Sequence, residues 1–137
     1  MARSRTLRGG VWLLVIGVVL AAGIAQGEQA PPTEKKGISA VEREAVDLGP
    51  EIPGMQGRYL RLRSGTIEPG GHNAIHTHAD RPEILYVVKG TVTEHRNGTT
   101  NEYREGEILV GTKETKHWIE NKGTTKATFL VVDIVKK

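Results

Sequence analysis

Short runs of alternating apolar and polar residues, separated by turn-forming residues, constrain the fold of this chain more than any other feature. Near the start of the pattern, Leu60 and Leu62 alternate with arginines, which is typical of a half-buried strand. Later runs are rich in β-branched and aromatic residues, and they occupy residues 83–96, 102–111, 116–121 and 127–135. Six or more short strands at regular spacing predict an all-β, antiparallel sandwich or barrel.

The residues between these runs favour turns. Asn97-Gly98 is the pair preferred by tight hairpins, and Gly106 interrupts the run over 102–111. Lys113-Glu114 and residues 121–124 separate the last three strand candidates. About 80 residues from Arg58 onward would form the folded core, which is small but within the range that folds alone.

Residues 1–25 have the pattern of a secretory signal peptide. The first ten residues carry three arginines and no acid, and residues 11–25 are apolar apart from glycines. This apolar run is shorter than the roughly 20 residues that a membrane span needs. We expect cleavage near Ala25 and export to the periplasm or the extracellular space, with no stable membrane association afterwards. The alternative is an uncleaved N-terminal anchor.

Removal of residues 1–25 changes the charge of the chain. Three of the 19 basic residues lie there, which leaves 16 basic and 16 acidic side chains. A near-neutral protein gives no reason to expect a nucleic-acid partner. The chain has no cysteine, so disulfides and a lipoprotein anchor are excluded.

The region before the strand pattern divides into two parts. Residues 26–45 begin with a polar, Pro-Pro-containing stretch that has little to bury, and we interpret them as a flexible tether. Residues 46–137 form the predicted domain. The prolines and glycines that close the segment 40–57 exclude a long helix there.

Two of the five histidines, His76 and His78, stand one residue apart. In a strand, residues i and i+2 face the same side, so both imidazoles would project together. Glu83 follows a predicted turn and is in phase with Leu85 and Val87 on the next strand. If that face is buried, a divalent cation would remove the cost of burying the carboxylate. The alternative is an exposed loop in which these side chains simply meet water.

The spacing around the pair is similar to the first motif of the cupin superfamily: Gly70, five residues, His76, one residue, His78, four residues, Glu83, six residues and a glycine. The second motif also matches in register, from Gly106 through His117 to Asn121. Thr112 replaces its usual proline and Glu114 its usual glycine. Over roughly residues 58–137 the chain therefore resembles a small single-domain cupin.

This resemblance implies a single β-barrel of the jelly-roll type. It also implies one divalent transition-metal ion, iron, manganese, nickel, copper or zinc, held by His76, His78, Glu83 and His117. Three imidazoles and one carboxylate suit such ions better than magnesium or calcium, which prefer oxygen ligands. An octahedral ion with four protein ligands would keep two open positions for water or for a chelating substrate.

The first 25 residues also bear on the identity of the metal. Arg3 and Arg5 are not adjacent, which argues against twin-arginine export of a folded protein. The ion would then be acquired outside the cytoplasm, where intrinsic affinities favour copper and zinc over iron and manganese. We therefore expect a native ion other than iron.

Other aromatic and titratable residues receive weaker assignments. His72 is a proton-shuttle or spare-ligand candidate that we interpret as a surface histidine, and His95 is expected to be exposed. Tyr86 and Trp118 are out of phase with the ligands and are expected to pack between sheets or at a dimer contact. Leu85, Val87 and Ile119 share the ligand face, which predicts a largely apolar pocket. No second carboxylate is evident on that face, and the weak acid-base candidate is Tyr59.

Two function classes follow from the resemblance. In the first, the chain is a metal-dependent enzyme, a dioxygenase, isomerase or lyase that acts on a small organic compound chelating the ion through two oxygens. In the second, it is a non-catalytic domain that binds or senses a small ligand through its metal. The fold itself does not decide between them. A homodimer is expected from the resemblance, and both faces of residues 127–135 are apolar enough for the outer side to be covered by a second sheet or by another subunit.

Overall fold

The computed structural model describes residues 30–137, and all regular structure among them is β. The nine strands are β1 (Lys36–Asp47), β2 (Arg58–His72), β3 (His76–Thr77), β4 (Glu83–Lys89), β5 (Thr91–Arg96), β6 (Thr99–Arg104), β7 (Ile108–Gly111), β8 (Lys116–Glu120) and β9 (Ala127–Lys136). No helix that could cross a membrane occurs in this described part. The expected signal peptide, residues 1–25, lies outside it.

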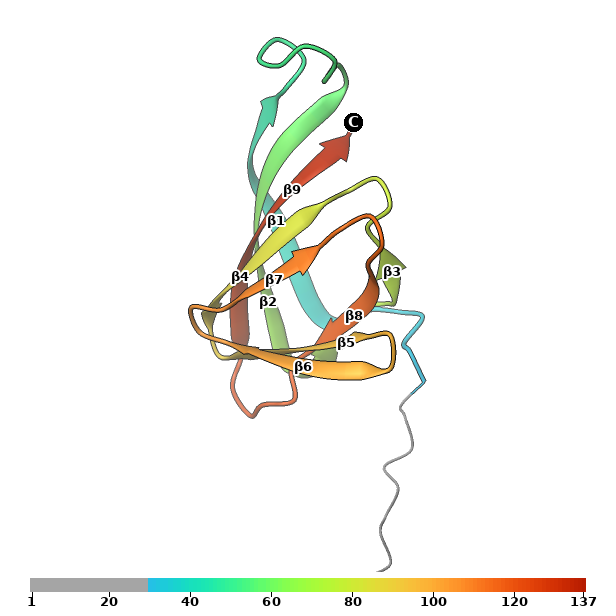
Figure 1. The fold of residues 1–137 in the computed structure, drawn as a ribbon. Coiled ribbons are helices and arrows are strands. Elements are labelled where there is room, and N and C mark those ends of the chain that lie inside the picture. Colours follow the sequence, from blue (N-terminus) through green and yellow to red (C-terminus); the bar gives the residue numbers. More distant parts are fainter. Residues whose placement is uncertain (1–29) are drawn as a thin grey trace, which may run out of the picture.

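The strands form one antiparallel sheet that bends into a nearly closed barrel (Figure 1). The order β6-β5-β8-β2-β9-β4-β7 is extended by β1, which pairs with β2, and by β3, which pairs with β8. A single register pair, His72 with Glu120, joins the long strands to the group β5, β6 and β8. This all-β barrel is the architecture that the sequence predicts.

The predicted turns lie where the sequence places them. Asn97 and Gly98 have φ values of 52° and 74°, as a tight hairpin between β5 and β6 requires. Gly90 has a φ of 80° and divides the run over 83–96 into β4 and β5. Residues 105–107 likewise divide the run over 102–111 into β6 and β7. Glycines with positive φ therefore set two of the strand boundaries.

The flexible tether predicted for residues 26–45 is wrong from Lys36 onward, because β1 begins there. β1 pairs with β2 from Lys36 opposite His72 to Asp47 opposite Tyr59. Only Ile38 and Ala45 of β1 are even half-buried, so its side chains carry no period-two signal. Backbone hydrogen bonds along the free edge of β2 fix this strand, and such bonds do not depend on side-chain pattern.

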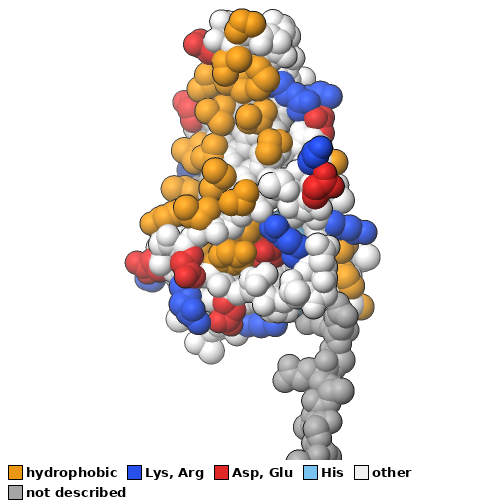
Figure 2. All heavy atoms as spheres, in the orientation of Figure 1, with side chains coloured by type: hydrophobic (Ala, Val, Ile, Leu, Met, Phe, Trp, Pro, Cys, Tyr) orange, Lys and Arg blue, Asp and Glu red, His pale blue; other side chains and the backbone are white. Residues whose placement is uncertain are grey.

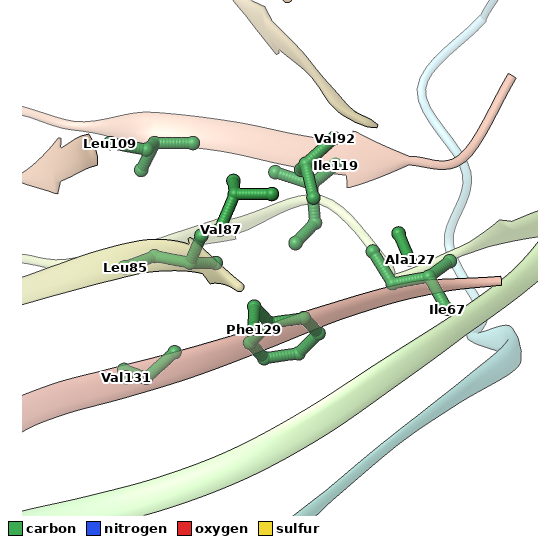
Figure 3. Packing of buried hydrophobic residues seen from close by; sticks show 9 residues of the cluster. All are labelled: Ile67, Leu85, Val87, Val92, Leu109, Ile119, Ala127, Phe129 and Val131. Atoms are coloured by element: carbon green, nitrogen blue, oxygen red, sulfur yellow. The ribbon is translucent and has the colours of Figure 1, made fainter. Parts of the chain in front are cut away.

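The core lies between the long strands and the group around β8, and Figure 3 shows its side chains converging from both. All of its members are at most 4% exposed. The cluster consists of Ile67, Leu85, Val87, Val92, Leu109, Ile119, Ala127, Phe129 and Val131. The predicted inward phase of Leu85, Val87 and Ile119 is therefore confirmed.

The outer face of the sheet carries exposed apolar side chains on β4, β7 and β9, and Figure 2 shows a band of them. The second sheet that could have covered β9 does not do so within the described residues, since Leu130 and Val132 remain 37% and 40% exposed. Tyr86 also lies on this outer face and not between sheets. Trp118, in contrast, is buried.

Gly65 is required by close packing in the middle of β2. A Cβ atom there would overlap the Phe129 ring and approach the Ser39 carbonyl oxygen to 2.7 Å. We expect Gly65→Ala to lower the free energy of unfolding by about 1–3 kcal/mol, as overpacking does, measured by urea denaturation. In a Phe129→Leu background the same change should cost less, because the ring is gone. An equal cost in both backgrounds would contradict this account.

Candidate metal centre

The structure brings His76, His78, Glu83 and His117 together. One ligand atom from each lies within 4.8 Å of all the others. His76 is half-buried, and the other three are buried. The four predicted site residues thus form one cluster, although they come from three strands and the turn between two of them.

Strand pairing places the two histidine segments side by side. His76 in β3 lies opposite His117 in β8. The backbone N–H of His78 donates to the Thr115 carbonyl at 3.0 Å, which ties His78 to the turn before β8. Gly111 completes the packing, since a Cβ there would lie 2.9 Å from Nδ1 of His78.

The turn before His117 forms without the proline and glycine that Thr112 and Glu114 replace. The Thr115 N–H donates to the Thr112 carbonyl at 2.8 Å. The Thr112 N–H in turn donates to the Thr115 hydroxyl at 3.0 Å. Local side-chain hydrogen bonding of this kind stabilises tight turns, so these two departures leave the position of His117 intact.

The hydrogen bonds of the three imidazoles leave every Nε2 atom free to act as a ligand. Nδ1 of His76, His78 and His117 lies 3.1, 2.9 and 2.5 Å from the Ala74 carbonyl, the Arg81 carbonyl and the Glu94 carboxylate. These partners only accept, so each Nδ1 donates, and in the neutral ring the lone pair is on Nε2.

The three Nε2 atoms converge on one point. Nε2 of His78 lies 3.0 Å from that of His76 and 2.8 Å from that of His117. Two acceptors cannot hydrogen-bond to each other, so converging lone pairs are favourable only around a cation. Ligand nitrogens about 2.1 Å from an ion and at right angles are about 3.0 Å apart. The donor set therefore fits a first-row transition-metal ion, with Glu83 as the anionic ligand.

Burial favours the neutral form of two of the imidazoles, those of His76 and His78. It lowers the pKa of His76 from 6.5 to about 4 and also lowers the pKa of His78. The folded chain then binds fewer protons than the unfolded chain between these values, so acid destabilises it. We expect the free energy of unfolding of metal-free protein to fall as the pH drops from 6.5 towards 4, measured by urea denaturation. His76→Gln should flatten this decline, and an unaltered decline would argue against His76 as its source.

Arginines surround the carboxylate side of the cluster. Asp133, opposite Glu83 in the sheet, is fully buried and accepts hydrogen bonds from Arg61, Arg63 and Arg81 at 2.9–3.1 Å. Arg81 also donates to Glu83 at 3.1 Å. Burial acts to raise the pKa of Asp133, but the arginines outweigh it and hold that pKa low. Asp133 is the second carboxylate on the ligand face that the sequence analysis did not find.

Glu94 holds His117 in the orientation needed for ligation. It is 1% exposed and accepts hydrogen bonds from His117, from Arg96 at 2.7 Å and from the Tyr103 hydroxyl at 3.0 Å. Burial acts to raise the pKa of Glu94, yet His117 and Arg96 lower it overall. A carboxylate behind a ligating histidine fixes the ring and increases its basicity.

Loss of this support should weaken metal binding. We expect Glu94→Gln to lower zinc affinity about 10-fold and Glu94→Ala up to about 100-fold, measured by competition with a chelator. Glu120→Gln is the matched control, because Glu120 bonds at 2.6 Å to His95, which lies outside the cluster. An equal loss in Glu120→Gln would mean that the effect is general destabilisation.

A cavity of about 350 Å³ opens beside the cluster. Of the four clustered residues, His76 and Glu83 line it. Most of the other lining groups are of two kinds, three basic side chains and a set of apolar side chains that includes Leu85 and Ile119 from the core; Ser39, Ala40 and Asn73 complete the lining. The prediction of a largely apolar pocket is therefore correct for one part of the wall and wrong for the other.

The weaker assignments have mixed outcomes. His72 ends β2, with its ring edge-on to Trp118 at 6.4 Å, and is not among the clustered ligands. His95 is not exposed as expected, because it stacks on Trp118 at 3.9 Å and its side chain is only 18% exposed. Tyr59 is wrong as an acid-base candidate, since its hydroxyl lies 3.4 Å from Asp47 and its side chain does not line the cavity.

The family of the chain follows from this barrel and its donor set together with a sequence comparison. The profile of the Cupin domain family matches residues 64–133, which is half of the chain and includes all four clustered residues. The chain belongs to the cupin superfamily. The cupin match begins within β2, so β1 and the first part of β2 lie outside it.

Individual relatives of this cupin are distant. It is 32% identical over 69 residues to an oxalate-binding protein of Thermotoga maritima, covering 50% of this chain and 57% of that protein. It is 29% identical over 85 residues to a germin-like protein of Arabidopsis thaliana, germin-like protein subfamily 2 member 2, covering 58% of this chain and 39% of the relative. The chain thus spans about half the length of these relatives.

Solved structures show the same barrel. A structure described as a predicted oxalate decarboxylase from Thermotoga maritima superposes with a TM-score of 0.58 at 21% identity, covering 77% of this chain and 93% of that one. Oxalate oxidase in complex with the substrate analogue glycolate superposes with a TM-score of 0.54 at 27% identity, covering 73% and 55%. The first likeness bears on the fold alone.

Proposed function

We propose that this cupin is an exported protein that holds one divalent transition-metal ion and uses it to bind and convert a small organic compound with two chelating oxygens. His76, His78, Glu83 and His117 would hold the ion. The observation that carries the proposal is the convergence of three histidine Nε2 atoms and one carboxylate at the wall of a cavity. A bound ion would supply Lewis acidity at the wall of that cavity.

The residues around the ion have separate tasks in this proposal. Glu94 and the Ala74 and Arg81 carbonyls orient the imidazoles. Arg81 and Arg63 contact Glu83 and limit its freedom to turn away from the ion. Leu85 and Ile119 exclude water from one part of the cavity wall, where they would contact the carbon skeleton of the compound.

The reaction class we propose is that of a dioxygenase, isomerase or lyase. Two relatives support a small oxygen-rich substrate, because one is described as an oxalate-binding protein and another as oxalate oxidase with glycolate bound. The test is oxygen uptake and product analysis with iron- or copper-loaded protein and a panel of catechols, flavonols, β-diketones and small carboxylates. Turnover that is lost in His76→Ala supports an enzyme.

A second candidate is a binding or sensing domain without turnover. The observation in its favour is that, apart from the proposed ligands, the titratable side chains of the described residues that line the cavity are all basic: Lys35, Arg63 and Arg81. A free carboxylate or imidazole in general acid-base range is not among them. Tight binding of a panel member without product would favour this candidate.

Export and metal identity form part of the same proposal. A leader at residues 1–25, cleaved near Ala25, would deliver the chain unfolded, and the ion would then be copper or zinc and not iron. Elemental analysis of protein purified from its native compartment tests this, and a full complement of iron would contradict it. We also propose a homodimer in which the exposed apolar face on β4, β7 and β9 is buried, with sedimentation velocity as its test.

A further inference from the structure

We propose that the ligand of the cavity is an organic carboxylate with an apolar skeleton, in which the carboxylate meets the basic side chains and the skeleton meets the core side chains. This inference rests on the proposed function, because it concerns the same cavity and the same ion. The metal cluster alone predicts only that the ligand has chelating oxygens. The two parts of the cavity wall add that the ligand is negatively charged and has an apolar skeleton.

The basic part of the wall requires a negative ligand. Lys35, Arg63 and Arg81 line the cavity. The nearby carboxylates do not balance these groups. Asp133 also bonds to a third guanidinium, that of Arg61, which lies 3.7 Å from Glu42. Even with Glu42 included, the four basic groups face only three carboxylates, those of Asp133, Glu83 and Glu42. Glu83 is a proposed ligand of the ion, and the ion adds two positive charges of its own. A neutral chelator would leave this excess positive charge without a counter-charge.

Arg63 is under-satisfied in the described structure. Its Nη2 donates to Asp133 at 2.9 Å and approaches Glu83 at 3.5 Å. Its Nε is buried and has no hydrogen-bond partner among residues 30–137. A buried, charged group with an N–H that lacks a partner carries a desolvation cost. An anion in the cavity would reduce that cost.

Apart from Ser39 and Asn73, the remaining wall is apolar, and most of it belongs to the core. Leu85, Ile119, Phe129 and Val131 are at most 4% exposed, and Ile38 packs against the same cluster from β1. A volume of about 350 Å³ lies within the range of about 300–1,000 Å³ that is usual for pockets that bind organic ligands. Oxalate consists of two joined carboxylates and has no carbon skeleton to place against this wall. A larger carboxylate would use both parts.

Several of the lining residues precede residue 64, where the family match begins, among them Lys35, Ile38 and Arg63. Lys35 and Ile38 lie farthest from that start, at the N-terminal strand. One is an exposed cation, and the other is a half-buried apolar residue of the edge strand β1. The N-terminal strand therefore supplies part of the specificity, and its residues can be changed without altering the proposed metal ligands.

Calorimetric titration of zinc-loaded protein tests the inference with three compounds that share a 2-oxo carbonyl group. Pyruvate and phenylpyruvate are both 2-oxo acids, and the methyl ester of phenylpyruvate lacks the charge. We expect phenylpyruvate to bind at least about 10-fold more tightly than pyruvate, the effect of burying about two methylene groups. We expect the ester to bind at least about fivefold more weakly than phenylpyruvate, the effect of about 1 kcal/mol of charge attraction.

Single variants separate the two parts of the wall. Lys35→Gln should weaken phenylpyruvate about fivefold and leave the ester unchanged. Ile38→Ala should weaken phenylpyruvate about fivefold and leave pyruvate unchanged. Lys89→Gln, an exposed residue at the end of β4, is the control for charge and should change neither affinity.

The outcomes distinguish this inference from the proposed function. Zinc content is measured first, and protein that takes up no zinc contradicts both. Zinc-loaded protein that binds pyruvate as tightly as phenylpyruvate, or the ester as tightly as the acid, overturns the inference and leaves the metal site standing. The inference is supported if phenylpyruvate binds more tightly than both pyruvate and the ester. Lys35→Gln should then reduce its advantage over the ester, and Ile38→Ala its advantage over pyruvate.

Discussion

Replacing His76 with alanine is expected to lower zinc affinity by more than about 100-fold, because loss of a residue that merely supports a ligand already costs about 10- to 100-fold. His76 is the half-buried member of the cluster, so its removal disturbs the core least. A ligand at 100 times its dissociation constant stabilises a folded protein by about 2.7 kcal/mol. The variant should lose most of the rise in melting temperature that zinc produces in the native chain.

The measurement is a chelator-competition titration combined with thermal unfolding, with and without zinc. His72→Ala is the matched control, since His72 lies four residues earlier and does not belong to the cluster. We expect the control to keep its zinc affinity and its zinc-dependent stabilisation. A His76→Ala protein that zinc still stabilises as strongly as the native chain would show that the ion binds elsewhere.

Asp133→Asn is expected to lower the free energy of unfolding by about 3 kcal/mol. Removal of one partner from a buried ion pair costs about 3–5 kcal/mol, because it leaves an uncompensated charge. The side chains of Arg61, Arg63 and Arg81 are 20–29% exposed and regain some hydration, so we expect the lower end of that range. Urea denaturation of the metal-free protein measures the change.

The control for this prediction is Glu68→Gln. Glu68 and Lys126 form an ion pair at 2.7 Å in which both side chains are 51% exposed. Exposed pairs contribute little to stability, so this variant should unfold like the native chain. If Asp133→Asn were equally benign, the three arginines would not depend on the buried carboxylate.

The local signals in the sequence were sufficient for an all-β, antiparallel fold, whereas the single barrel and the ligand cluster were predicted from the family resemblance. The strand runs, the Asn97-Gly98 hairpin and the inward phase of Leu85, Val87 and Ile119 depend on period-two patterning and turn chemistry, both of which act within a few residues. The association of His76 with His117 is long-range. It could be predicted because the spacing of two motifs resembles that of a family with a known arrangement.

Interactions between distant strands account for what the sequence did not predict. β1 pairs through its backbone with the free edge of β2, and its side chains show no apolar–polar alternation from which a strand could be predicted. Asp133 and Glu94 did carry a usable signal, because each is in phase with buried neighbours, Val131 and Val92 respectively. What the sequence could not provide is their partners, since Arg61 lies 72 residues from Asp133.

The stacking of His95 on Trp118 is a further case of this kind. Beside a hairpin turn, a histidine is usually exposed, and the local pattern alone supports that expectation. The β5–β8 pairing places His95 directly opposite Trp118, and Glu120 supplies a carboxylate at 2.6 Å. The pairing of two strands thus removes a side chain from water that its own segment would have left exposed.

Metal content tests the central claim most directly. Purified full-length protein would be stripped with a chelator, reloaded with zinc, desalted and analysed for the element per chain, beside the same preparation of His76→Ala. The account predicts one zinc ion per native chain and much less than one in the variant. A native chain that retains no zinc, nor any of the other first-row ions offered in the same way, would contradict it.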